Sequence, residues 1–534
     1  MAVKGSKALV TVMALGTFVV VLDNTIMNVS ITALVKDLGT TVSGVQTAIA
    51  LNALMMAAFV LMGGKMADII GMKRTFFAGA VIYIIGSLLA SFSNSLPVFI
   101  LGWCAIQGFG AAMMLPNVNT IIRANVAGKA RAQAYGLMAG INAVATAVGP
   151  IIGGFLTTFF SWRWAFRLEV FILLFVLFSR SVVPKDVLTK VRPKLDTVGV
   201  AWQAAAMIFL VLGTLAISDY GLLIAKQPLK IGSFEFEPLG LSIVPFLWGI
   251  GLFCLSRFAK WERASMATKR NVLIDLRLFK IKNFTRGLSV RFLQVALIAG
   301  TTFSVPLYLQ VTFGLSAFRT GFILLGLTAG LLTTALGGAR RGLNYLPKQK
   351  VEWGFLTCVF GLLVMMVTMI VIKDPWWLLP GLFIYGAGLG LIASQIVNLV
   401  MSAVDPKQTA EASGITSTLE TLGSSVGTAI IGTVLVVSLT NGIGRLVSNS
   451  AVFSDADKAQ ITNHLSKSVE VVSTNVVSGQ IKQSGENKNE VISIYDQARK
   501  NAFIITLLFM AVVAAASYGL SKGLPAAKVS EVAA

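Results

Sequence analysis

One carboxylate stands alone in a long apolar stretch near the N-terminus. Residues 8–35 contain Asp23 as their only charged side chain, within the sequence VVVLDNTIMN. A charge at the centre of a membrane helix costs about 2.5–3.5 kcal/mol on insertion scales. Such an acid is either a structural group held by hydrogen bonds or a group that binds and releases a proton. We take Asp23 as the first candidate for proton chemistry and keep the structural alternative open.

Three further acids lie in apolar stretches. Glu420 falls in the middle of residues 410–439 and is the second candidate for proton or substrate binding. Glu411 lies near the end of the same stretch, and we expect it to be solvated. Glu169 has Arg167 two residues before it, so we expect a structural ion pair at the edge of the membrane.

A carboxyl group in a partly dry cavity has a chemistry suited to exchange. Removal from water favours its protonated form, whereas a bound cation favours its ionised form. A proton and a cationic compound would therefore compete for one carboxylate, and this competition would couple their movements in opposite directions.

Other chemistries lack the residues they need. The three cysteines, Cys104, Cys254 and Cys358, lie far apart in apolar stretches, and the one histidine, His464, lies in a polar segment. These spacings match no disulfide framework or metal site. The phosphate-binding motif G-x-x-x-x-G-K-[ST] does not occur. We therefore expect no enzyme activity, no metal and no cofactor. We expect a proton gradient to be the source of energy.

The elements that position these acids are apolar helices. The chain has 534 residues, of which 55% are hydrophobic and 13% charged, and its mean hydropathy is +0.79. A soluble protein carries about 25% charged residues, so this composition indicates a helical protein with many membrane spans. We predict fourteen spans at residues 8–35, 45–63, 75–93, 97–121, 134–159, 165–183, 198–218, 240–257, 287–310, 320–338, 353–372, 376–403, 410–439 and 501–520.

The positive charges give an orientation. Most of the 44 Lys and Arg residues fall between spans on the side of the N-terminus, and many of the others lie in one long loop, residues 441–500. Because positive residues gather in short cytoplasmic loops, both termini are expected in the cytoplasm. The same distribution explains the net charge of +21 without a nucleic-acid partner. The first apolar stretch is too long for a signal peptide, and we expect a multi-pass protein of a bacterial cytoplasmic membrane.

Matching glycines indicate an internal repeat. The sequence GINAVATAVGPIIGG (140–154) aligns with GITSTLETLGSSVGTAIIG (414–432), and GWCAIQGFGAA (102–112) aligns with GLFIYGAGLGL (381–391) at nearly the same offset. The fourth and fifth spans thus correspond to the twelfth and thirteenth, so two extra helices must lie between the repeats. Parallel repeats of this kind are typical of transporters with a binding site between the halves.

The segment from 140 to 154 also resembles a family motif, G-x8-G-P-x-x-G-G. The matching residues are Gly140, Gly149, Pro150, Gly153 and Gly154. On this motif the chain resembles the major facilitator superfamily, and specifically its fourteen-helix drug:proton antiporters of the EmrB/QacA type. Small residues allow close helix approach and proline bends a helix. In the family, a helix with this motif occurs in transporters that work by exchange rather than by symport.

A second motif follows the second span. The segment GKMADIIGMKR matches the superfamily loop G-x-x-x-D-x-x-G-x-[RK]-[RK] through Gly64, Asp68, Gly71, Lys73 and Arg74. The resemblance implies a gating loop, in which Asp68 faces a helix N-terminus or an arginine of the other half. The corresponding segment of the second half, GARRGLNYLPK, lacks the acid, so we expect a one-sided lock.

Two more segments resemble the family within the spans. LDNTIMN fits the first-span pattern through Asp23, Thr25 and Asn28, and CAIQGFGAA fits the fourth-span pattern through Gln107, Gly108 and Gly110. The arginine that the family uses there in proton handling is Cys104 in this chain. Thr47 and Asn52 stand for the usual Trp and Tyr of the second span, and Glu169 stands for the usual Asn of the sixth.

The resemblance implies an all-α major facilitator fold. We expect a six-helix bundle at residues 1–183, two inserted helices at 184–286 and a second six-helix bundle at 287–534 that includes the outer loop 441–500. The implied function is proton-coupled export of lipophilic, mostly cationic drugs, with the lipid bilayer, protons and small molecules as partners and a monomer as a possible state. The departures of this chain from the family pattern leave two alternatives. One is a dedicated exporter of one metabolite, lipid or anionic compound, and the other is a membrane sensor that does not transport.

Overall fold

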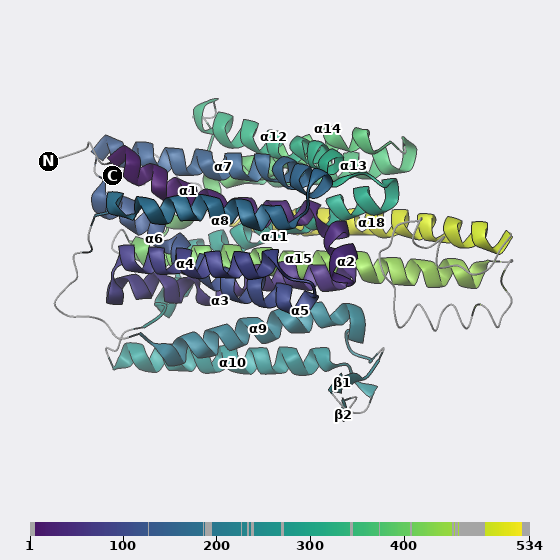
Figure 1. Ribbon diagram of the computed structural model, residues 1–534, viewed down its shortest axis with the longest axis horizontal. Coiled ribbons are helices and arrows are strands. Elements are labelled where there is room, and N and C mark those ends of the chain that lie inside the picture. The colour runs from purple at the N-terminus through teal and green to yellow at the C-terminus, as the bar shows by residue number, and fades with distance from the viewer. Residues whose placement is uncertain are drawn as a thin grey trace.

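Nearly all of the described chain is helical (Figure 1). The computed structural model describes residues 6–126, 128–184, 186, 195–225, 227–231, 234–236, 240–268, 272–341, 345–372, 374–405, 408–450, 453, 458 and 486–525. The helices of the first part are α1 (Ser6–Val29), α2 (Ile31–Leu38), α3 (Val42–Ile70), α4 (Met72–Ser91), α5 (Leu96–Phe99), η1 (Ile100–Gln107), α6 (Gly108–Asn125), α7 (Gly128–Phe159), α8 (Arg163–Phe178) and η2 (Ser179–Val182). The later helices are α9 (Thr197–Tyr220), α10 (Ile243–Ala267), η4 (Leu276–Lys280), α11 (Lys282–Phe313), α12 (Ala317–Arg341), α13 (Pro347–Val371), η5 (Pro375–Trp377), α14 (Leu378–Met401), α15 (Thr409–Asn449) and α18 (Glu486–Ser521).

Each of the fourteen predicted spans falls on helical segments, although the spans at 8–35 and 97–121 each cover more than one of the named helices. Within the described residues, twelve helices are long and apolar enough to cross a membrane. The other two are α8, which has 16 residues, and α7, in which Val144–Phe159 is a shorter apolar stretch. The structure therefore establishes a polytopic helical membrane protein, and the count of fourteen spans stays a prediction.

Three boundaries differ from the sequence-based expectation. The first predicted span breaks at Ser30, so that α2 forms a separate short helix. The segment 441–500, predicted to be a polar loop, is helical at both ends because α15 continues to Asn449 and α18 begins at Glu486. The fold is also not purely helical, since β1 (Leu229–Ile231) and β2 (Phe234–Phe236) pair as a small antiparallel hairpin between α9 and α10.

The repeat predicted from the glycines appears in the packing. A side chain at Gly153 of α7 would collide with the backbone of Ile26 in α1. Its match in the second half, Gly427 of α15, is equally close to the backbone of Ala296 in α11. The two helices thus approach the first helix of their own half through equivalent glycines, which is how small residues bring membrane helices together.

The fourth-span glycines show the same correspondence. Gly110 of α6 lies against the backbone of Tyr83 in α4, and Gly388 of α14 lies against the backbone of Cys358 in α13. The halves of the chain therefore share one packing plan, with α4 equivalent to α13 and α6 to α14.

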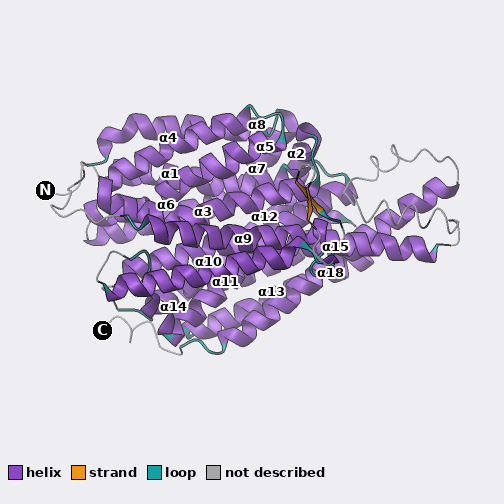
Figure 2. Cartoon of the chain, turned by 90° about the horizontal axis from the view of Figure 1, so that it is seen from below, coloured by secondary structure: helices purple, strands orange, loops and turns teal. Residues whose placement is uncertain are grey.

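The two helices between the repeats form a hairpin at the edge of the bundle. α9 and α10 pack along each other, and α9 also contacts α3 and α15 (Figures 1 and 2). This arrangement agrees with an inserted helix pair, although the boundary expected at residue 286 falls inside α11. The division into 1–183, 184–286 and 287–534 remains a prediction.

Both chain ends lie at the same end of the bundle (Figure 1). We call this the terminal end, and the opposite end, where α2 lies, the distal end. α1 therefore carries Asp23 from the terminal end towards the distal end, and α11 carries Gln310 in the same direction in the second half.

Candidate functional site

A π-helical segment in the fourth span positions three polar side chains. η1 covers Ile100–Gln107 and is followed directly by α6. The wide turns of a π-helix are rare and often occur at functional sites. Trp103, Cys104 and Gln107 all lie on η1, and all three are buried.

Asp23 is buried against this segment. Its side chain on α1 is 3% exposed, and both of its carboxylate oxygens accept hydrogen bonds from the indole Nε1–H of Trp103, at 3.0 and 3.1 Å. Hydrogen bonds to a charged group contribute about 1.5–3 kcal/mol. The first candidate acid is thus held inside the first half of the protein, away from the open surface.

An aromatic cluster fixes the orientation of the indole. The ring of Trp103 lies 5.1 Å from that of Phe99 and 6.3 Å from that of Phe166, measured between centroids. Trp162 closes the cluster in an edge-to-face contact with Phe99 at 5.4 Å. Because such ring pairs prefer particular angles, α8 and η1 together direct the Trp103 N–H towards Asp23.

Glu169 lies in the same interior and not at the edge of the membrane. Its carboxylate on α8 is fully buried, and its Oε2 accepts hydrogen bonds from Tyr83, Ser87 and Gln107 at 3.4, 3.3 and 3.3 Å. The expected ion pair with Arg167 is wrong, because that guanidinium donates to the Ser91 hydroxyl at 3.0 Å. Arg167 and Glu169 are two residues apart, so they project from different faces of the helix.

Glu420 occupies a different site, in the second half. Its Oε1 lies 2.8 Å from Nε of Arg291 on α11, and these side chains are 30% and 17% exposed. Arg291 also donates to Gln294 at 2.7 Å, whose amide donates to the backbone of Leu389 at 2.8 Å. Glu420 is therefore part of an ion pair between α15 and α11, and its role in coupling stays a proposal.

The remaining matched residues of the first span pack tightly. Thr25 donates to the carbonyl of Leu22 at 2.8 Å, and its side chain fills the space that Gly149 of α7 leaves open. Asn28 donates to the carbonyl of Asn24 at 2.7 Å, while its buried carbonyl oxygen has no partner in the described part of the chain.

The fourth-span matches pack in the same way. Cys104, which stands at the position of the family arginine, donates its thiol to the carbonyl of Ala48 at 3.1 Å. Gly108 faces the backbone of Asn52 on α3, and Gly110 faces α4. Cys104 thus places an uncharged thiol at this position, and the side chain of Gln107 forms the hydrogen bond from η1 to Glu169.

The glycine motif of α7 connects the two halves. Gly149 and Gly153 face α1, whereas Gly154 faces Ala317 of α12. The carbonyl of Pro150 lies in the space left by Gly321 of α12. Gly140 lies earlier in α7, so the part of the motif from Gly149 to Gly154 holds α7 between one helix of each half.

The loop motif forms a helix cap that the sequence did not predict. Gly71 adopts φ +104°, a conformation that favours glycine. The carboxylate of Asp186 accepts hydrogen bonds from the backbone N–H groups of Lys73 and Arg74 at 2.8 and 3.2 Å, which neutralises the N-terminus of α4. The ammonium group of Lys73 donates to the carbonyl of Val183.

Asp68 does not act as the cap in this conformation. Its side chain is exposed and forms no hydrogen bond or ion pair with the described residues. Gly64 meets only the Pro116 side chain, at 3.8 Å. The cap of α4 comes instead from Asp186, so the predicted lock through Asp68 stays a proposal for another conformation.

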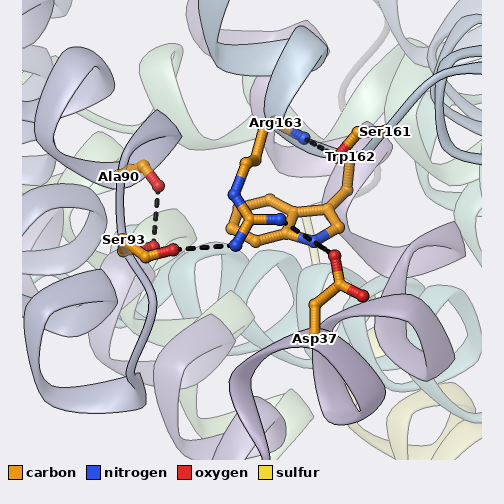
Figure 3. Close-up of polar contacts among 6 residues, drawn as sticks. All are labelled: Asp37, Ala90, Ser93, Ser161, Trp162 and Arg163. Carbon is orange, nitrogen blue, oxygen red and sulfur yellow. Dashed lines mark hydrogen bonds and ion pairs between the residues drawn. The ribbon is translucent and has the colours of Figure 1, made fainter.

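A second polar cluster lies at the distal end (Figure 3). The carboxylate of Asp37 on α2 accepts hydrogen bonds from the Trp162 indole at 3.0 Å and from the Arg163 guanidinium at 2.9 Å. Arg163 lies over the Trp162 ring at 4.4 Å and donates to the carbonyl of Ser93 at 2.9 Å. These contacts fasten α2 to the start of α8.

Sequence reasoning missed the uncharged partners of Asp23 and Glu169. Trp103, Tyr83 and Ser87 carry no charge and occur in apolar stretches, so no local pattern distinguishes them from packing residues. Glu169 did carry a signal, because it is an acid inside a predicted span, as Asp23 is. The nearby Arg167 obscured that signal, because an ion pair between Arg167 and Glu169 was the simpler interpretation.

The chain belongs to the Major Facilitator Superfamily, whose sequence profile matches residues 13–428. It is 26% identical over 437 residues to a protein of Streptomyces coelicolor named "Probable actinorhodin transporter", covering 77% of this chain and 69% of that one. It is 25% identical over 457 residues to Multidrug resistance protein 3 of Bacillus subtilis, covering 85% and 84%. Other relatives with multidrug or antibiotic resistance names are about equally similar.

The solved structures support the same fold. A bacterial homologue of the human lysosomal transporter Spinster, in an inward-facing and occupied conformation, superposes with a TM-score of 0.61 at 13% identity and covers 98% of each chain. The chain is therefore a multi-pass membrane transporter of this superfamily, and the identity is too low to carry over a substrate.

Proposed function

We propose that the protein exports lipophilic, mostly cationic compounds across the cell membrane in exchange for protons. The observation that carries this proposal is the carboxyl group of Asp23, buried inside an apolar helical bundle with an uncharged donor, Trp103, as its partner. A buried acid without a basic partner is neutralised most simply by a proton. The multidrug resistance names of several relatives support the substrate class.

The proposed topology has fourteen spans with both termini in the cytoplasm, as in the EmrB/QacA type. Three observations support it: the positive charges gather on one side, both chain ends lie at the same end of the bundle, and α9 and α10 form a separate helix pair. The proton gradient would supply the energy without a cofactor, and the partners would be the substrate, protons and the bilayer.

The proposal is tested by transport in proteoliposomes. We expect the wild-type protein to accumulate a cationic dye when a pH gradient is imposed, and Asp23→Asn to fold but lose this accumulation. Glu352→Gln is the matched control, because its carboxylate lies 3.9 Å from Lys348 near the start of α13, away from the Asp23 site. Equal dye accumulation by Asp23→Asn and the wild type contradicts the proposal.

A second candidate is a dedicated exporter of one compound. It is favoured by Cys104, which stands where the drug antiporters carry an arginine, and by the name of the actinorhodin transporter relative. A resistance screen in a host without its own efflux pumps separates the candidates. Resistance to many unrelated cations supports the multidrug exporter, and resistance to one compound class supports the dedicated one.

A further inference from the structure

The carboxyl groups of Asp23 and Glu169 face each other inside the first half. They come from α1 and α8, and lie within hydrogen-bonding reach of each other. Both are buried, with exposed fractions of 3% and 0%. Two ionised carboxylates at this separation repel each other, and a pair of this kind is stabilised when one proton is shared.

The hydrogen-bond donors around the pair are fewer than the buried acceptors. Trp103 supplies Asp23, and Tyr83, Ser87 and Gln107 all donate to Oε2 of Glu169. Oε1 of Glu169 and Oε1 of Gln107 are buried and have no donor among the described residues. Buried acceptors without a donor are costly. A proton bound between the two carboxyl groups would supply a donor for Oε1 of Glu169.

Among the residues that the structure describes, no basic side chain forms an ion pair with either acid. Arg167, the nearest basic residue along α8, donates to Ser91 and lies over the Trp164 ring at 4.9 Å. The other titratable groups that face the pair are the phenol of Tyr83 on α4 and the thiol of Cys104 on η1, and neither is a cation. A bound proton is therefore the positive charge that would balance the two acids.

We propose that Asp23 and Glu169 form one proton site, which binds a single proton between them and exchanges it during transport. This inference rests on the proposed function and adds Glu169 as the second half of the site. The step transfers only a proton. A proton from water binds to a carboxylate oxygen and later returns to water on the other side of the membrane, and no electrons are transferred. Trp103 and Gln107 are positioning residues that hold the two acids together.

The first test separates coupling from substrate movement. Wild type and variants are reconstituted in proteoliposomes, and two quantities are measured: dye accumulation driven by a pH gradient, and dye counterflow without a gradient. One proton exchanged per dye molecule supports about a tenfold dye gradient per pH unit, because one pH unit is worth 1.36 kcal/mol per proton. We expect Glu169→Gln to retain counterflow and to lose this roughly tenfold accumulation.

Two variants serve as controls. Glu169→Asp keeps a carboxyl group at the site and is expected to recover part of the accumulation, whereas Glu352→Gln, whose carboxylate lies 3.9 Å from Lys348 in α13, is expected to retain proton-driven accumulation. Wild-type accumulation by Glu169→Gln overturns the proposal. Loss of both activities in a folded Glu169→Gln protein also overturns it, since Glu169 is then structural. Accumulation driven by a sodium gradient at constant pH overturns it as well.

The second test does not depend on transport. Infrared spectroscopy of the protein in lipid detects the carbonyl stretch of a protonated carboxyl group. We expect this band in the wild type and in Glu352→Gln at neutral pH, and its loss in the double variant D23N/E169Q. If the wild type fails to transport any cation but shows this behaviour, the proposed function fails and the proton site stands. A band that persists unchanged in the double variant overturns the site.

Discussion

The indole N–H of Trp103 donates to both carboxylate oxygens of Asp23, at 3.0 and 3.1 Å. This single contact joins α1 to the π-helical segment of the fourth span. It also covers the acid, which is 3% exposed, so a substrate cannot reach Asp23 unless α1 or η1 moves. The proposed proton binding at Asp23 and the packing of these two helices would thus be linked through one side chain.

Replacement of this indole tests the link. Trp103→Phe keeps an aromatic ring against Phe99 but removes the donor, and we expect it to lower the free energy of unfolding by about 1.5–3 kcal/mol. We also expect it to weaken dye accumulation driven by a pH gradient. The first effect is measured by thermal unfolding in detergent, the second in proteoliposomes.

Trp261→Phe is the matched control for that experiment. The Trp261 indole donates to both oxygens of Asp196 at 2.9 Å, in the same geometry but at the start of α9. We expect a similar loss of stability and unchanged coupling. Equal losses of coupling in the two variants would show that Trp103 acts only through stability.

The repeated glycines give a second prediction, about packing. A methyl group at Gly153 would lie 2.9 Å from the Cα atom of Ile26, and one at Gly427 would lie 2.5 Å from the Cα atom of Ala296. We expect both Gly153→Ala and Gly427→Ala to lower the melting temperature and the yield of folded protein, because two helix backbones must separate.

Gly249→Ala and Gly519→Ala are the controls, since nothing lies within 4 Å of an added methyl group at either position. Both lie inside helices, where alanine is more stable than glycine by roughly 0.5–1 kcal/mol. Their melting temperatures should stay the same or rise. A drop in the controls as large as that in the two packed positions would contradict the packing argument.

The sequence predicted the helices well because apolar length is a local property. Each predicted span falls on helical segments, and the glycines of α7 and α15 predicted equivalent packing positions. Helix ends were less predictable. α15 runs on to Asn449 through polar residues, and the break at Ser30 follows no proline or glycine.

The site was only half predictable, since its acids are visible in the sequence and their partners are not. Asp23 is conspicuous as the sole charge in its stretch. That Trp103 and Glu169 lie beside it depends on how α1, η1 and α8 meet, which no local pattern encodes.

The ion pair between Arg291 and Glu420 gives a third prediction. Their side chains are separated by 2.8 Å and only partly exposed, so we expect each of Arg291→Gln and Glu420→Gln to destabilise the protein by about 1 kcal/mol. In the double variant R291Q/E420Q the losses should not add, because both substitutions remove the same interaction. Thermal unfolding of the four proteins measures this coupling, and strict additivity would show that the pair contributes nothing.

Gln310 gives the last prediction, about motion at the distal end. Its amide donates to the carbonyl of Val29 at 2.8 Å and its carbonyl accepts from Thr32 at 2.5 Å, so one side chain of α11 binds both α1 and α2 across the two halves. Gln310→Leu keeps the bulk and removes both hydrogen bonds. We expect it to shift the population towards conformations that are open at this end.

Spin labels at Lys36→Cys and Arg319→Cys, two exposed distal positions, report the change as a longer mean distance by electron–electron double resonance. The native cysteines are buried, which favours labelling of the introduced ones. Gln395→Leu is the control, because among the described residues that amide donates to its neighbour Ser394 within α14 and not to another helix, and its distance distribution should match the wild type. An unchanged distribution in Gln310→Leu would show that the distal end is held by packing alone, through contacts such as that of Gly154 with Ala317.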